Sequence, residues 1–129
     1  MYLVDTSVLV DFLKGKENSK TQKFEEILLH NIPFALSAFT YQEVLQGARD
    51  MTEYKKLNTY LSTQKILYPL KSSYEKSAKI FFECRKKGIT IRSTIDTLIA
   101  STAIENNLIL LHNDRDFDYM AKVIEMRVE

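Results

Sequence analysis

The sequence predicts an α/β fold with a central, mostly parallel sheet of four to five strands and helices on both faces. Three observations predict it. Short apolar runs alternate with longer amphipathic stretches, which is the order of strands and helices around a parallel sheet. The apolar runs are continuous, as in strands buried on both faces. No repeat, low-complexity tract or Pro/Gly-rich linker interrupts the pattern, so we expect one domain over residues 1–129.

The first strand is predicted at Tyr2–Val4, and it ends abruptly in Asp5 and two hydroxyl residues. The apolar pattern that follows has helical spacing and stops near Gly15, a residue type that favours helix ends. Apolar residues at helical spacing, with charges between them, predict a second helix over 19–30. The run 34–36 is the second predicted strand.

Two helices are expected between the second and third strands. Ser37 opens the first, and Glu43 lies off its apolar face. That apolar face consists of Tyr41, Val44, Leu45 and Ala48. The second helix spans Met51–Leu61. Its apolar stripe consists of Tyr54, Leu57 and Leu61. Residues 65–68 predict the third strand, which Pro69 stops because proline lacks a backbone N–H donor.

The last third of the chain predicts two more helices and one more buried strand. Helical spacing covers 71–87 and again 93–106, where a serine three residues before an aspartate resembles a capping box. The fourth strand is predicted at 108–111, and 123–128 is a candidate edge strand. The face expected to point inward from the helix 71–87 consists of Tyr74, Ala78, Phe81 and Phe82.

Composition is that of a soluble globular protein, with 45% hydrophobic and 27% charged residues. No apolar run approaches the roughly 20 residues of a membrane span, and we recognise no secretory signal. The single cysteine, Cys84, excludes an intrachain disulfide, and one cysteine with two histidines disfavours a Cys/His zinc site. We expect a cytoplasmic protein without a membrane partner.

Charge is unevenly distributed although the net charge is only +1. Residues 1–53 carry a balance of −3, residues 54–92 a balance of +8, and residues 93–129 a balance of −4. A basic middle between acidic ends indicates a polyanionic partner held near an acidic site. The simpler alternative is that the lysines only solvate helix faces.

Four acids occupy special positions in this scheme. Asp5 follows the first strand and Asp114 the fourth, whereas Glu43 and Asp96 lie in the first turns of helices. Strand C-termini and the N-termini of the following helices share one edge of a parallel sheet, where ligands collect, so we expect these carboxylates to converge. Taken singly, each acid also fits a structural role as a helix cap, helix-dipole partner or turn residue.

Crowded carboxylates repel one another, so a site of this kind requires a cation. Oxygen ligands without cysteine or histidine favour Mg²⁺ or Mn²⁺, which polarise a phosphoryl oxygen and activate water for attack on a phosphodiester. No residue is an obvious protein general base. We expect His30 and His112 to be structural and unpaired, and Asp11 and Asp118 to be solvated.

Four segments have a specific order and spacing, although each is degenerate alone. They are LVDTSVL (3–9), SAFTYQEVLQG (37–47), IDTLIASTA (95–103) and LLHNDRDF (110–117). Together they resemble the PIN-domain ribonucleases, and in particular the VapC-type toxins of VapBC toxin–antitoxin pairs. The resemblance covers essentially the whole chain.

This resemblance implies a PIN-like nuclease domain that cleaves RNA with Mg²⁺ or Mn²⁺ and leaves a 5′-phosphate and a 3′-hydroxyl. The positions that match the four catalytic, metal-binding acids of the family are Asp5, Glu43, Asp96 and Asp114. Thr6 matches a hydroxyl commonly found beside the first acid, where it supports the metal site without binding the metal. Asp116 is the alternative fourth ligand, and we prefer Asp114 because it lies nearer the strand end. The family also implies a homodimer, a VapB-type antitoxin that inserts a segment near the active site, and operator DNA bound only through the antitoxin.

Two other functions stay open from the sequence. A housekeeping PIN nuclease for RNA maturation would have the same acids, and growth arrest on expression without a partner separates it from a toxin. A non-catalytic interaction module would use the helices 19–30 and 51–61 as a groove for a partner helix. A phosphatase of the haloacid dehalogenase type is disfavoured because it needs an acid at the position of Ser7. The RNA, the number of metal ions and the antitoxin are not specified by the sequence.

Overall fold

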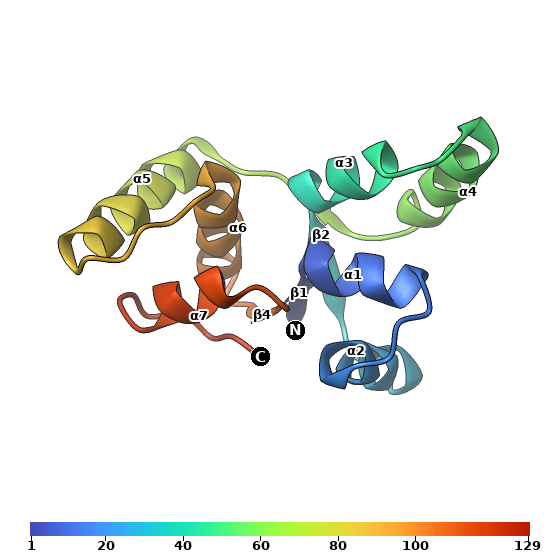
Figure 1. Cartoon of the computed structure of the whole chain (residues 1–129), viewed down its shortest axis with the longest axis horizontal. Helices are drawn as coiled ribbons and strands as arrows, with labels where there is room; N and C mark the ends of the chain where they lie inside the picture. The colour runs from blue at the N-terminus through green and yellow to red at the C-terminus, as the bar shows by residue number, and fades with distance from the viewer.

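The computed structural model describes all residues from 1 to 129. It confirms the α/β architecture, with a four-stranded sheet between two groups of helices (Figure 1). The elements in chain order are β1 (Tyr2–Val4), α1 (Thr6–Leu13), α2 (Ser19–Leu29), β2 (Phe34–Ser37), α3 (Ala38–Gln46), α4 (Met51–Leu61), β3 (Ile66–Leu67), α5 (Lys71–Lys86), α6 (Thr94–Glu105), β4 (Ile109–Leu111) and α7 (Arg115–Ala121).

The strands are all parallel, in the order β3-β2-β1-β4. In the central strand β1, Leu3 is level with Ala35 of β2 and Leu110 of β4. Because all four strands run the same way, their carboxyl ends share one edge of the sheet. The residues that follow β1 and β4 therefore leave the sheet side by side.

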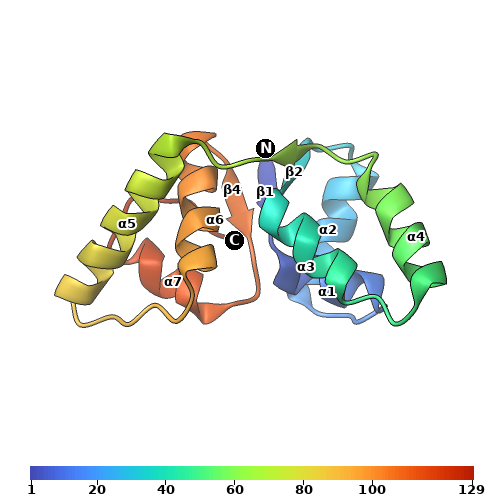
Figure 2. The same ribbon diagram turned by 90° about the horizontal axis from the view of Figure 1, so that it is seen from above.

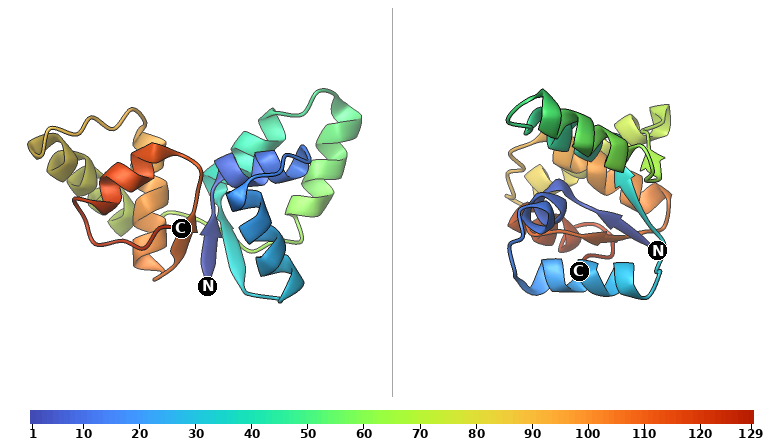
Figure 3. Two further views of the ribbon diagram at one scale, coloured as in Figure 1. Left: turned by 60° about the horizontal axis from the view of Figure 1, so that its bottom comes forward. Right: turned by 90° about the vertical axis from the view of Figure 1, so that its right-hand side faces the viewer.

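Helices α1 to α4 cover one face of the sheet and α5 to α7 cover the other (Figure 2). Strand β1 contributes side chains to both faces, because successive residues of a strand point to opposite sides of the sheet. Leu3 belongs to the hydrophobic cluster under α5, α6 and α7, whereas Tyr2 and Val4 belong to the cluster under α1 to α4. The chain ends lie close together (Figure 3), where the Tyr2 hydroxyl donates to the Glu129 carboxylate at 2.8 Å.

The expected edge strand at 123–128 does not form beyond one bridge, between Leu110 and Val128. The turn after α7 explains this result. The backbone N–H groups of Val123 and Ile124 both donate to the carbonyl of Met120. These residues continue the helical turn, so only the last few residues of the chain reach the edge of β4.

The prediction of which face of α5 points inward is wrong. Tyr74 and Phe82 are 54% and 48% exposed, Ala78 is exposed as well, and Phe81 is only partly buried. The side chains that α5 buries instead are Ser73, Ser77, Ile80 and Cys84.

Close packing between α5 and α6 explains why this other face of α5 is buried. The Ser77 and Thr97 hydroxyls lie 2.7 Å apart between the two helices, and the Ser73 hydroxyl donates to the Glu105 carboxylate. Small hydroxyl side chains at this interface let the two helices pack closely, and the rings of α5 are left outside. Because the serines find hydrogen-bond partners in α6, burying them does not leave unpaired polar atoms.

Several smaller expectations also differ from the structure. Tyr54 of α4 is 37% exposed rather than inward, and Ala48 lies beyond the end of α3. Ser93 precedes α6, but its side chain makes no capping hydrogen bond. Helix α7 was not expected from the sequence. No helix in the structure combines the length and apolar character needed to cross a lipid bilayer.

Candidate active site

Acidic side chains gather where the parallel strands end. Asp5 directly follows β1 and caps α1, and Asp114 follows β4 and caps α7. Asp96 lies in the first turn of α6, and Glu43 lies in α3. The capping roles are therefore real for Asp5 and Asp114, and they coincide with the position at the sheet edge that the sequence predicted.

Three of the aspartates form a tight cluster. One carboxylate oxygen from each of Asp96, Asp114 and Asp116 lies within 4.8 Å of the other two. Asp114 and Asp116 lie close together because Asp114 caps α7. Its Oδ1 accepts the backbone N–H of Asp116 at 3.0 Å. Both acids that the sequence left as alternatives therefore lie in the cluster, and Asp116 is the more buried of the two, at 3% exposure.

Asp96 experiences the combined field of the acids. Burial, and then the charges of Asp114, Asp5, Asp116 and Glu43, raise its pKa from 3.8 to about 7. Asp5 and Glu43 lie outside the tight cluster but are close enough to act on Asp96. This is the electrostatic situation that a divalent cation relieves. Since the donors are all carboxylate oxygens, the residues fit a hard cation.

Asp5 is buried, and burial raises the pKa of its carboxyl, while hydrogen bonds from Ser7 act in the opposite direction. Its Oδ2 accepts the Ser7 hydroxyl at 2.6 Å and the Ser7 backbone N–H at 3.1 Å. The Ser7 hydroxyl oxygen also accepts the backbone N–H of Asn113 at 2.9 Å. Ser7, which the sequence analysis did not single out, thus ties the loop after β1 to the loop after β4.

The side chain of Thr6 contacts Glu43. Its hydroxyl donates to Glu43 Oε1 at 2.9 Å and lies 3.0 Å from the Thr40 hydroxyl. Thr6 follows Asp5 in the chain, and its hydroxyl holds Glu43. The signal in the sequence was the position of Thr6 beside Asp5, which gave no indication of the partner across the fold.

Arg92 is a second residue that the sequence analysis missed. Its Nε lies 3.2 Å from Asp116 Oδ2, and its Nη2 lies 3.9 Å from Asp114 Oδ1. It ends the basic stretch 54–92. The other basic residues of this stretch lie mainly on α4 and α5, at opposite ends of the molecule (Figure 2). Arg92 therefore brings the positive charge of this stretch to the acidic cluster.

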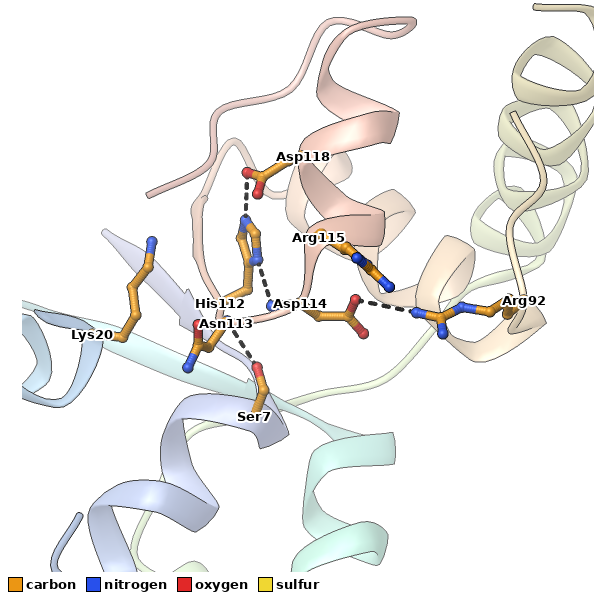
Figure 4. Close-up of a pocket in the computed structure, with 8 residues that line it drawn as sticks. All are labelled: Ser7, Lys20, Arg92, His112, Asn113, Asp114, Arg115 and Asp118. Carbon is orange, nitrogen blue, oxygen red and sulfur yellow. Dashed lines mark hydrogen bonds and ion pairs between the residues drawn. The ribbon is translucent and has the colours of Figure 1, made fainter. Parts of the chain in front are cut away.

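His112 is buried, as expected, but it is not unpaired. Its Nδ1 accepts the backbone N–H of Asp114 at 3.1 Å, and its Nε2 lies 3.3 Å from Asp118 Oδ1 (Figure 4). Burial lowers the pKa of the imidazole, with the charge of Asp118 acting in the opposite direction. His112 therefore supports the loop that carries Asp114, while Asp118 is largely exposed, as expected.

A separate groove of about 800 Å³ lies along α1, α3 and α4, and Glu43 forms part of its wall. Its apolar lining consists of Val10, Leu13, Val44, Leu57 and Tyr60. The sequence placed a groove on the helices 19–30 and 51–61. The second helix does contribute, but α2 does not, because it packs beside α1 on the far side from α4 (Figure 1).

Comparisons with known proteins agree with this fold. A family model described as PIN domain matches residues 2–123. Ribonuclease VapC51 of Mycobacterium tuberculosis is 30% identical over 122 residues, which cover 95% of this chain and 86% of that protein.

Two solved structures have a similar fold. VapBC2 from Rickettsia felis, bound to a DNA fragment from its promoter, has a TM-score of 0.77 at 23% identity and covers 99% of this chain and 96% of its own. A toxin–antitoxin complex from Klebsiella pneumoniae has a TM-score of 0.70 at 25% identity, with 91% and 90% covered. The chain therefore belongs to the PIN-domain family and, within it, to the VapC-type group.

Proposed function

We propose that this chain is a metal-dependent endoribonuclease and the toxin of a VapBC-type toxin–antitoxin pair. The observation that carries the proposal is the cluster of Asp96, Asp114 and Asp116 at the carboxyl edge of the sheet, with Asp5 and Glu43 close enough to raise the pKa of Asp96. The name of VapC51 gives ribonuclease as the activity of a similar protein. The whole chain, 1–129, would form the nuclease domain and act in the cytoplasm.

Asp5, Asp96 and Asp114 are the residues assigned to hold Mg²⁺ or Mn²⁺, and Glu43 completes the site. When bound, the ion polarises a phosphoryl oxygen of RNA and lowers the pKa of water. The protein groups position these ligands: Ser7 fixes Asp5, Thr6 fixes Glu43, and His112 supports Asp114. Asp116, buried and paired with Arg92, is the alternative fourth ligand.

The groove along α1, α3 and α4 is assigned to the antitoxin. Its apolar floor fits an amphipathic segment, and Glu43 in its wall would receive a basic side chain from that segment. A VapB-type antitoxin seated there would reach the acidic site. This chain would bind operator DNA only through the antitoxin, and two copies of the chain would form a homodimer.

The test is cleavage of single-stranded and structured RNAs by the purified chain, with and without Mg²⁺ or Mn²⁺. Asp96→Asn is expected to lower the cleavage rate by more than about 100-fold, because loss of several kcal/mol of transition-state stabilisation costs a factor of ten per 1.4 kcal/mol. Glu75→Gln, on the exposed outer side of α5, is the matched control and should cleave normally. Full cleavage by folded Asp96→Asn would contradict the assignment.

A growth assay separates the toxin from a housekeeping nuclease with the same site. Expression of the chain alone should arrest growth, and co-expression of its antitoxin should restore it. Metal-dependent cleavage in vitro without growth arrest would instead favour RNA maturation. A folded chain that neither cleaves RNA nor binds a divalent ion would favour a non-catalytic interaction module.

A further inference from the structure

A polar cavity of about 520 Å³ lies beside the acidic cluster (Figure 4). None of the eight residues that line it is hydrophobic. Asp114 belongs both to the cavity wall and to the acidic cluster, so a molecule in the cavity would extend directly from the proposed cleavage site. The size suits a single nucleotide unit rather than a macromolecular segment.

The cavity carries more positive than negative side chains. Lys20, Arg92 and Arg115 line it, against Asp114 and Asp118. Arg92 is engaged with the acids. Lys20 and Arg115, by contrast, make no side-chain ion pair or hydrogen bond within the chain. A cation on the acidic cluster would offset the charge of Asp114, which leaves the cavity more positive still.

A buried histidine borders the same cavity and faces one of its two acids. His112 is 2% exposed, and its Nε2, which is itself shielded from solvent, lies 3.3 Å from Asp118 Oδ1. Because Nδ1 accepts the backbone N–H of Asp114, the proton of the neutral ring resides on Nε2. The Nε2–H group therefore faces the Asp118 carboxylate, which leaves Lys20 and Arg115 as the free cations of the lining.

We propose that this cavity binds the RNA backbone phosphate that neighbours the cleaved bond. Lys20 and Arg115 supply the positive charge that holds the phosphate. Phosphate is the group in RNA that matches free cations in a cavity without apolar walls, whereas stacked bases would need aromatic or apolar side chains. The inference rests on the proposed ribonuclease function and assigns the substrate contacts of that site.

The test measures binding of a 5′-phosphorylated, fluorescently labelled single-stranded RNA octamer by anisotropy in EDTA, where no cleavage occurs. Lys20→Ala and Arg115→Ala should each weaken binding by about 3- to 10-fold, and each should reduce the slope of log K against log salt concentration by about 0.7, the value for one phosphate contact on a single strand. Arg115→Lys should keep most of the slope. Lys79→Ala, on the exposed side of α5, is the matched control and should bind like the wild type.

Cleavage of the same RNA in Mn²⁺ separates this inference from the proposed function. If the wild type cleaves and both alanine variants bind and cleave as well as it does, the cavity assignment is overturned while the ribonuclease function stands. An equal loss of binding in Lys79→Ala would also overturn it, because binding would then be diffuse. Binding that depends on Lys20 and Arg115, without any cleavage by the wild type, would support the cavity and contradict the nuclease.

Discussion

The two halves of the acidic site are held by different forces. On the side of β1 and α3, hydroxyl groups fix the acids: Ser7 donates to Asp5, and Thr6 donates to Glu43. On the side of α6 and α7, three aspartates face one another without any hydroxyl donor. The positive side chain that pairs with the acids of that second half is Arg92.

This difference indicates which half of the site is preorganised and in which half the carboxylates repel one another. Neutral donors hold the carboxylates of the first half in place whether or not a cation is bound. The second half concentrates negative charge, and there burial and then the charges of the acids in both halves raise the pKa of Asp96 to about 7. We therefore expect cation binding to depend most on the second half, and the orientation of ligands to depend most on the first.

The largest expected effect is on metal binding. Asp96→Asn and Asp114→Asn should each weaken Mn²⁺ binding, measured by calorimetry, by more than about 100-fold, because loss of a supporting partner alone costs about 10- to 100-fold. Glu43→Gln should weaken Mn²⁺ binding by only about tenfold. Equal losses in all three variants would remove the distinction between the halves. Asp116→Asn tests whether Asp114 or Asp116 is the fourth ligand. We expect it to weaken Mn²⁺ binding less than Asp114→Asn does.

The first half is tested by Thr6→Val, which keeps the shape of the side chain and removes its hydroxyl. Without the bond to Glu43, we expect RNA cleavage to fall by about tenfold while the protein stays folded. Thr6→Ser retains the hydroxyl and is the control that should cleave normally. Unchanged cleavage by Thr6→Val would mean that Glu43 does not depend on this contact.

Arg92→Ala tests whether the internal cation competes with the metal. Arg92 neutralises part of the charge on Asp116 and Asp114, so its removal should tighten Mn²⁺ binding by about 2- to 5-fold, the range expected for an exposed ion pair. Arg49→Ala, which removes an exposed arginine paired with Glu53 away from the cluster, is the control. Weaker Mn²⁺ binding in Arg92→Ala would show instead that Arg92 orients the acids.

The smallest effect concerns the pH dependence of stability without metal. Because the pKa of Asp96 is raised from 3.8 to about 7, the folded state retains a proton between these pH values that the unfolded state has lost. The contribution of Asp96 to stability therefore falls as the pH rises from about 4 to about 7. Asp96→Asn removes this penalty, and a gain of about 1 kcal/mol at pH 8 would raise the melting temperature by about 4 °C.

The difference in melting temperature between Asp96→Asn and the wild type should vanish near pH 4. Comparing the two proteins at each pH isolates this residue, since the lowered pKa of His112 acts oppositely by reducing stability as the pH falls. Adding Mn²⁺ at pH 8 should stabilise the wild type and leave the variant almost unchanged. A variant less stable than the wild type at pH 8 without metal would contradict the electrostatic account.

Helix α5 and strand β1 mark the limits of what the sequence predicted about the fold. For β1, a continuous apolar run ending in an acid indicated a central buried strand, and the strand is found there. For α5, the length and ends were predicted nearly correctly, but the large rings were placed inside. Hydrophobicity assigns the face of a helix only when its neighbour offers an apolar surface, and α6 instead offers hydroxyl and carboxylate partners to Ser73 and Ser77.

The sequence by itself determined the order of the elements as far as β4, although not α7, and the convergence of acids at one sheet edge. Both follow from local periodicity and from the rule that parallel strands end together. Only the tertiary structure decided which side chains support those acids: Thr6 holds Glu43, Ser7 joins the loops after β1 and β4, and Arg92 faces Asp116. These contacts join residues from 24 to 106 positions apart. Hydrogen bonds and ion pairs over such separations depend on distances of a few ångströms that local sequence patterns do not encode.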